Sequence, residues 1–288
     1  MNPRAEAMDK LGGDYEVRVL EPSPPAVTEP PFADDPVDPG EVPEGRRLVS
    51  PVSQHGDLTW GELAAADPDL AGWCAERWLG AWKRLEALPD SFGATRESLH
   101  KVAEAVVSPA RQPANEIALR YTFGGFGTPF FEQDGKDCQV RVQHGVLVRQ
   151  RGRDEEREPL PGVDEGAAGA LGDFYGFACS VLEEIRAENP DEDPTATQLW
   201  PEHFDIAIEL GSEAGSARAN YGASPGDEHH PEPYLYVGPW VPARADGEFW
   251  NGTGFAGAEL SYTELLGAED QRRAAVDFMR DRLAALRD

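Results

Sequence analysis

The sequence predicts an α+β fold in which a largely antiparallel sheet of about seven or eight strands is flanked by about four helices. Short segments that alternate apolar with polar residues, separated by tight turns, are typical of antiparallel strands. Longer segments with apolar residues at steps of three and four are typical of amphipathic helices. They occupy residues 70–88, 95–106, 167–187 and 269–287.

The first 56 residues differ in composition from the rest. They hold ten of the 25 prolines and many acidic residues, but few large apolar ones. Proline removes backbone hydrogen-bond donors, and a segment with little apolar surface to bury stays disordered. We therefore expect residues 1–56 to form a disordered, acidic, proline-rich arm and residues 57–288 to form a single α+β domain.

The helix expected at 70–88 carries Trp73, Trp78 and Trp82. Large aromatic side chains on one stripe anchor a helix to a core or to a partner protein. We favour the core, and keep a non-catalytic interaction or scaffold protein as the alternative.

In the next helix, Thr95 is expected to be the N-cap, and Ser108-Pro109 is expected to end the helix. His100 lies beside its apolar stripe, where a histidine more often packs against neighbours than binds a ligand.

Strand-like segments follow, reading IALRYTF, TPFF, CQVRVQ and VLVRQ. The GGFG stretch at 124–127 lacks the spacing of a phosphate-binding loop, so we expect a hairpin or a bulge there. The charged residues from 151 to about 166 are expected to form a surface loop before the helix at 167–187.

The segment FDIAIEL alternates in polarity, so its two faces differ. Its polar face carries His203, Asp205, Ala207 and Glu209. We expect the chain to return along SARANYG, to turn through ASPGDEHHPEP, and to form two more strands at PYLYVGPW and at 257–266.

Residues 116–187 and 204–287 share one order, several antiparallel strands and then an amphipathic helix. This order suggests an internal duplication of a β-meander-plus-helix unit. The two units would build one continuous sheet with helices on one face, rather than two independent domains.

The formal net charge of −27 limits the partners of the chain. Nucleic acid and anionic membrane surfaces both attract clusters of Lys and Arg, so we expect neither as a partner.

Cys74, Cys138 and Cys179 lie far apart, as expected for inert thiols in a reducing cytosol. We expect a cytoplasmic protein, because neither a signal peptide nor a long apolar run is found.

Ionisable residues concentrate in the hairpin expected at 199–240. Imidazoles and carboxylates brought together there would hold a divalent metal, with His203, Asp205, His229 and His230 as the candidate ligands. The same groups would also serve general acid and base chemistry. Alternation alone would instead place them on a solvent-exposed face of the sheet.

The loop sequence NYGASPGD places hydrogen-bonding groups beside aromatic residues, as in many ligand pockets. The candidate ligand-binding residues are His100, Trp200, Asp205, Asn220, Ser224, Asp227, Tyr234 and Tyr236. Ser224 lies outside any GxSxG pattern, so we do not expect it to be a nucleophile. In the alternative interpretation, the loop is a rigid hairpin whose Asp and Ser side chains bond to their own backbone.

The patterns SLH, GDFY, LWPEHFDIAIEL and PYLYVGP, within residues 95–285, resemble a bacterial family of unknown function that is common in actinobacteria. The residues that match its positions are His100, Asp173, Phe174, Tyr175, Trp200, Phe204, Asp205, Ile206 and Ala207. His203 stands where that family has a small residue, and His229-His230 has no counterpart, which weakens the metal hypothesis. The resemblance implies no activity.

We therefore expect a small-molecule-binding protein or an enzyme of unassigned reaction, with its pocket at the 199–240 hairpin. The alternatives are an interaction protein that uses the helix at 70–88, and a metal-dependent hydrolase that uses His203, Asp205 and one of the paired histidines. The sequence predicts neither the substrate nor the oligomeric state.

Overall fold

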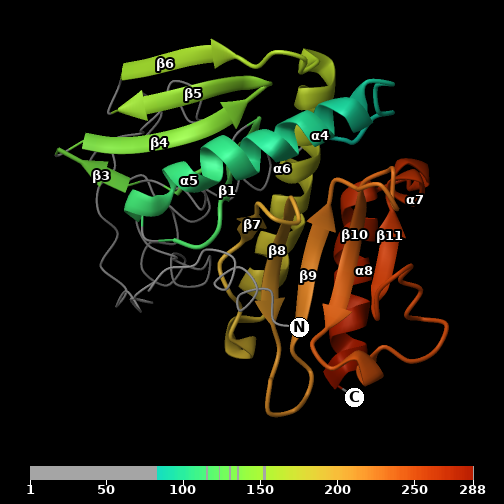
Figure 1. Ribbon diagram of the computed structural model, residues 1–288. Coiled ribbons are helices and arrows are strands. Elements are labelled where there is room, and N and C mark those ends of the chain that lie inside the picture. Colours follow the sequence, from blue (N-terminus) through green and yellow to red (C-terminus); the bar gives the residue numbers. More distant parts are fainter. Residues whose placement is uncertain are drawn as a thin grey trace, which may run out of the picture.

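The computed structural model describes residues 83–287, except residues 115, 123, 130, 135, 152 and 153. The arm expected at 1–56 and the three tryptophans from 73 to 82 lie outside this range. Two antiparallel sheets and the long helix α6, Glu165–Glu188, form the body of the protein (Figure 1). The α+β class and the antiparallel pairing are as predicted.

The first sheet contains six strands in the order β1-β2-β4-β5-β6, with β3 paired to β4. The strands are β1 Arg120–Thr122, β2 Gly125–Gly127, β3 Phe131–Gln133, β4 Lys136–Gln143, β5 Val146–Arg151 and β6 Asp154–Pro159. The GGFG stretch lies in the β1–β2 hairpin, as expected, and contributes Gly124 of the turn, with a φ of 73°, and strand β2. Strand β6 lies where a surface loop was expected, so that prediction was wrong.

The second sheet contains five strands in the order β11-β10-β9-β8-β7. The strands are β7 Gln198–Trp200, β8 Asp205–Leu210, β9 Ala219–Ser224, β10 Tyr234–Pro239 and β11 Ala258–Ser261. The strand predicted at 257–266 ends at Ser261, where a capping box starts helix α7, Tyr262–Gly267. Helix α8, Gln271–Arg287, closes the chain.

Within the described residues, one bridge, between Leu119 and Leu199, links the two sheets edge to edge. Each residue donates its backbone N–H to the carbonyl of the other, at 2.8 and 2.9 Å. The single sheet of seven or eight strands is therefore not confirmed, because the described part of the chain forms eleven strands in two sheets. The two meanders keep the order of the proposed duplication, which remains a prediction.

The first described helix, α4, spans Phe92–Val102 and continues through a π-helical turn, Ala103–Val107, into α5, Ser108–Ala110. The helix begins three residues before the predicted N-cap. Thr95 lies inside it, and its hydroxyl accepts the backbone N–H of Asp164 at 3.2 Å. Short 3₁₀ turns occupy Gln112–Ala114, Pro190–Glu192 and Pro242–Arg244.

The C-terminal part of the helix predicted at 70–88 is not helical. Residues 83–89 carry no regular structure. Leu85 is buried, and its backbone N–H and carbonyl both bond to the side-chain amide of Gln271, at 2.7 and 3.0 Å. A tertiary contact to α8 thus replaces the hydrogen bonds that a helix would have made.

Helix α6 packs against α4 and α8 and against strands of both sheets. Two glycines permit the close approach to the β1–β2 hairpin. A Cβ on Gly172 would lie 2.5 Å from the backbone of Gly124, and one on Gly176 would lie 2.8 Å from the hydroxyl of Tyr121. The core that results includes the fully buried aromatic residues Phe126, Phe174, Tyr175, Phe177, Phe204 and Tyr221.

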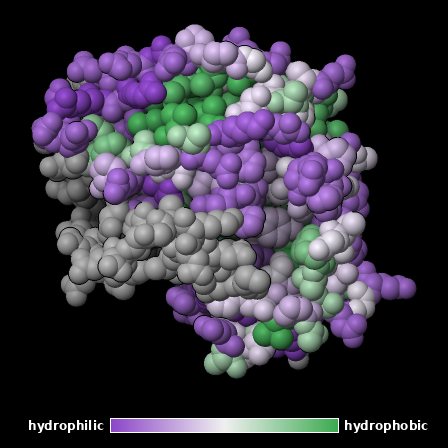
Figure 2. Space-filling model, in the orientation of Figure 1, coloured by the Kyte–Doolittle hydropathy of each residue, from purple (hydrophilic) through white to green (hydrophobic). Residues whose placement is uncertain are grey.

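Helices α6 and α8 cover one face of the second sheet, and its outer face is turned toward the viewer in Figures 1 and 2. The described surface seen in Figure 2 is mostly hydrophilic, with its largest apolar area over the first sheet. Among residues 83–287, no helix is long and apolar enough to cross a membrane.

Candidate functional site

The polar residues of the second sheet lie in rows across its outer face. Tyr234 pairs with Ser224, which is level with Asp205 because Ile206 pairs with Ala223. In the next row, Ala207 pairs with Gly222 and Gly222 with Tyr236. The alternation predicted for FDIAIEL is therefore present, and it directs Asp205 away from the helices.

A pocket of about 570 Å³ opens over these rows. We call it the Asp205 pocket, and its lining residues are His203, Asp205, Ser224, Asp227, His229, His230, Tyr234, Tyr236, Thr253, Gly254 and Phe255. Eight of the eleven were candidates from the sequence. The three others come from the loop that precedes β11, where a single aromatic residue among glycines gave no local signal of a site.

Asp205 is buried, with 8% of its surface exposed. One carboxyl oxygen, Oδ2, accepts a hydrogen bond from the hydroxyl of Tyr236. The other, Oδ1, is buried and has no hydrogen-bond partner in the described part of the chain. Burial raises the pKa of Asp205, although the Tyr236 hydrogen bond and the nearby His203 oppose the rise.

Tyr236 reaches Asp205 because Gly222 has no side chain. A Cβ on Gly222 would lie 2.5 Å from Cζ of the Tyr236 ring. The ring also meets Phe255 edge-on, at 6.2 Å between centroids. Burial, together with the Asp205 charge, raises the pKa of Tyr236 well above its ordinary value, so the hydroxyl remains a proton donor.

Phe204, directly before Asp205, has a left-handed backbone with a φ of 55°. Bulky residues adopt this conformation only when their surroundings hold it. The Phe204 N–H donates to the carbonyl of Trp200 at 2.7 Å, and its carbonyl accepts from the Tyr175 hydroxyl at 2.6 Å. The His100 ring stacks on the Phe204 ring, with centroids 5.0 Å apart and planes 4° apart.

Four of the residues that carry the family resemblance are thus in contact around Phe204. His100, Tyr175 and Trp200 each contact Phe204, and Phe204 leads into Asp205. Their shared role in this structure is to fix the backbone at the start of β8.

The loop between β9 and β10 forms one wall of the pocket. Asp227 accepts the backbone N–H groups of His229 and His230, both at 2.7 Å, and Ser224 accepts that of Gly226 at 3.2 Å. Burial opposes ionisation of Asp227, yet these backbone hydrogen bonds lower its pKa. The loop is therefore a hairpin whose side chains bond to its own backbone and which also lines the pocket, and ligand binding by it stays a prediction.

The four predicted metal ligands all line the Asp205 pocket. No group of three or more His, Cys, Asp or Glu residues in the described ranges has an arrangement that would hold a metal ion. His203 is exposed at the rim, and His230 lies instead 3.5 Å from Glu259 and 4.8 Å from the ring of Tyr234. The described arrangement thus does not support the metal hypothesis for His203, Asp205, His229 and His230, which stays a prediction.

Three predicted ligand-binding residues lie outside the pocket lining. His100 bonds through Nε2 to the carbonyl of Pro201, at 2.8 Å. Trp200 is buried with Ala118 and Ala207. Asn220 accepts the indole N–H of Trp240 at 3.2 Å. His100 and Trp200 pack near the start of β8, whereas Asn220 lies beside Glu209 and Trp240, away from the Asp205 pocket.

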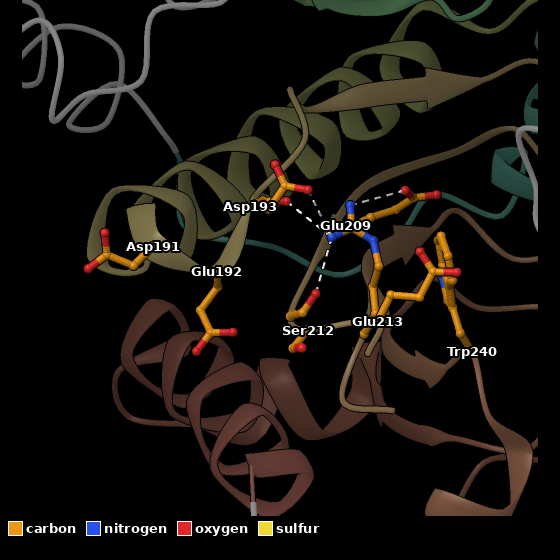
Figure 3. Close-up of a pocket in the computed structure, with 9 residues that line it drawn as sticks. Asp191, Glu192, Asp193, Glu209, Ser212, Glu213 and Trp240 are labelled. Atoms are coloured by element: carbon orange, nitrogen blue, oxygen red, sulfur yellow. Dashed lines mark hydrogen bonds and ion pairs between the residues drawn. The ribbon is translucent and has the colours of Figure 1, made fainter. Parts of the chain in front are cut away.

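A second, acidic pocket of about 450 Å³ lies near the far end of β8 (Figure 3). Its lining residues are Asp191, Glu192, Asp193, Glu209, Gly211, Ser212, Glu213, Arg218 and Trp240. The Arg218 guanidinium lies 3.5 Å from Glu209 and 3.6 Å from Asp193, and it stacks over Trp240 at 5.2 Å. Glu209 Oε1, like Asp205 Oδ1, is buried without a hydrogen-bond partner among the described residues. The Glu209 carboxylate nevertheless has a cationic neighbour in Arg218, whereas Asp205 has a neutral phenol.

Comparison of the chain with protein-family models, with curated proteins and with solved structures gives no match. The family resemblance therefore remains a prediction from the sequence patterns.

Proposed function

We propose that the protein binds a small polar molecule in the Asp205 pocket. The observation that carries this proposal is the buried Oδ1 of Asp205, which has no hydrogen-bond partner among the described residues. An unsatisfied buried acceptor costs about 1–3 kcal/mol, and more when it is charged. The oxygen is covered, so a ligand in the pocket would remove the cost by donating a hydrogen bond to it once the carboxyl group has turned toward the cavity.

The neighbouring backbone strengthens the proposal. A left-handed non-glycine residue costs about 1–3 kcal/mol, and Phe204 places this strain directly beside Asp205. Such features persist most often at binding and catalytic sites, because the folded surroundings must be built to hold them.

The pocket proposal is tested by a thermal-shift screen of small polar compounds against the full chain and its Asp205→Asn variant. Asparagine keeps the shape of the side chain but places an amide where the second oxygen was. At about 100 times its Kd, a ligand adds about 2.7 kcal/mol to the stability of the folded state. We expect compounds that raise the melting temperature of the wild type and lose this effect in Asp205→Asn.

Glu209→Gln is the matched control, since Glu209 is a buried carboxylate on the same face of the same strand. The ligand-induced shifts in melting temperature of Glu209→Gln should equal those of the wild type. If no compound gives a shift that depends on Asp205, the proposal is wrong.

A second candidate function is general acid and base catalysis in the same pocket. It is favoured by the raised pKa of Asp205, which moves this carboxyl toward the range in which it exchanges protons with a substrate. NMR spectra of a bound compound over time provide the test. Chemical conversion by the wild type but not by Asp205→Asn supports catalysis, and binding without conversion limits the site to recognition.

A further inference from the structure

We propose, building on the ligand-binding function above, that the Asp205 pocket recognises an organic cation bearing N–H groups, a primary ammonium or guanidinium on a compact apolar body. Three properties of the wall support this class of ligand: its aromatic rings, its charge, and the acceptor at its base.

Aromatic rings line the pocket at different angles. The rings of Tyr234 and Tyr236 lie 6.2 Å apart and are inclined by 52°, and Phe255 stands at 82° to Tyr236. His230 adds a fourth ring, 4.8 Å from Tyr234. Electron-rich ring faces attract cations. Inclined rings surround a compact charged group, whereas a flat sugar ring stacks best on one flat aromatic surface.

The charged groups on the wall favour a cation. Asp205 and Asp227 both line the pocket, whereas no Lys or Arg of residues 83–287 does. Each of the two paired histidines has a carboxylate within 4 Å: His229 lies 3.4 Å from Glu228, and His230 lies 3.5 Å from Glu259 and 3.8 Å from Asp227. A positive charge on either imidazole would therefore be compensated inside the protein. An anionic ligand would be repelled by both aspartates.

The unpartnered oxygen of Asp205 distinguishes an N–H cation from a quaternary one. A quaternary ammonium would satisfy the aromatic rings but has no proton to donate to Oδ1. The oxygen itself is covered in this structure, so binding requires the carboxyl group to turn toward the cavity, and this turn also moves Oδ2 away from the Tyr236 hydroxyl. The terminal torsion of an aspartate is broad, so this rotation needs no backbone change.

Four matched probes test the inference by titration calorimetry on the full chain: benzylamine, benzyltrimethylammonium, benzyl alcohol and benzoate. They share one ring and differ in charge and in N–H donors. A charge-assisted hydrogen bond corresponds to roughly tenfold or more in affinity. We expect benzylamine to bind at least about tenfold more tightly than benzyl alcohol, with benzyltrimethylammonium between them and benzoate the weakest.

Two variants locate the effect. Asp205→Asn should remove most of the preference for benzylamine over benzyl alcohol, and Phe255→Ala should weaken both cations by a similar factor. Glu209→Gln, in the Arg218 pocket, should change none of the affinities. Phe255 lies in a loop and is only partly buried, so its variant is expected to fold.

The outcomes of these titrations distinguish recognition of an N–H cation from the more general binding of a small polar molecule in the Asp205 pocket. If benzyl alcohol or benzoate binds as tightly as benzylamine and depends on Asp205, the cation class is overturned and the ligand-binding function stands. If benzylamine binds equally to the wild type and to Asp205→Asn, the role of Asp205 in cation recognition is overturned. If no probe and no compound in the wider screen binds in an Asp205-dependent way, both proposals fail.

Discussion

The hydroxyl of Tyr175, in the middle of helix α6, donates a hydrogen bond of 2.6 Å to the backbone carbonyl of Phe204. Through this contact the central helix holds the left-handed residue that starts strand β8 and presents Asp205 to the pocket. The conformation of the site thus depends on a residue 29 positions earlier in the chain.

Tyr175→Phe should destabilise the protein by about 1–3 kcal/mol, because it leaves a buried carbonyl without its donor. Denaturant unfolding measures the loss. Tyr262→Phe is the control, since its hydroxyl bonds to the carbonyl of the exposed Glu86, where water replaces it. Equal midpoints for Tyr175→Phe and the wild type would contradict the role given to this contact.

Gly222→Ala should destabilise the second sheet by about 1–3 kcal/mol, because its Cβ overlaps the ring of Tyr236. The displaced ring would also lose its hydrogen bond to Asp205. Gly238→Ala, in β10, meets nothing within 4 Å and should change stability by less than about 0.5 kcal/mol. Thermal unfolding compares the two variants, and a similar loss in both would count against the close approach of Tyr236.

Asp205→Asn should alter how stability depends on pH. The raised pKa of Asp205 means that the folded state binds this proton more tightly than the unfolded chain does. The free energy of unfolding of the wild type therefore falls as pH rises from the ordinary aspartate pKa to the raised one, and then levels off. The stability of Asp205→Asn relative to the wild type should increase across this interval.

Asp227→Asn should change the pH dependence of stability in the opposite direction to Asp205→Asn, because backbone hydrogen bonds lower the pKa of Asp227. Its ionisation stabilises the folded state above the ordinary pKa, and this contribution disappears as pH falls through the lowered one. Denaturant unfolding from the acid range to neutrality should thus give opposite trends. Parallel trends would refute the two pKa directions.

Glu183→Gln should destabilise the protein by about 3–5 kcal/mol, because it leaves the buried Arg186 guanidinium without its carboxylate. The two side chains are 4% and 5% exposed, and their atoms are 2.8 Å apart. Glu188→Gln, on the same helix, removes a more exposed ion pair with Arg280 and should cost less than about 1 kcal/mol. Chemical denaturation measures the loss of stability in each variant. A larger loss in Glu188→Gln than in Glu183→Gln would contradict the stabilising role given to the buried ion pair.

The periodicity of apolar residues in the sequence predicted strand β8 and helices α6 and α8. The alternation of β8 identified its polar side and with it Asp205, and the helical periodicity located α6 and α8 to within about two residues. The same alternation did not show that both faces of β8 are buried, since Trp200 covers the outer face at Ala207 only in the folded chain.

The failures have separate causes. Strand β6 reads DEEREP and has no apolar alternation, because an edge strand needs none. The start of α7 carried the Ser-x-x-Glu signature of a capping box at Ser261 and Glu264, so it was detectable. The contact of Phe255 with Tyr236 joins distant segments, and no single-segment pattern would reveal it.

The bridge between Leu119 and Leu199 also affects how the protein behaves at high concentration. An unpaired strand edge recruits strands from other molecules and starts aggregation. The bridge joins the residue directly before β1 to a residue of β7, so at this point each sheet covers part of the edge of the other. At the opposite ends lie β6, which is highly charged and ends in Pro159, and β11, which has four residues and runs directly into a helix. Both are poor templates for the growth of a fibril.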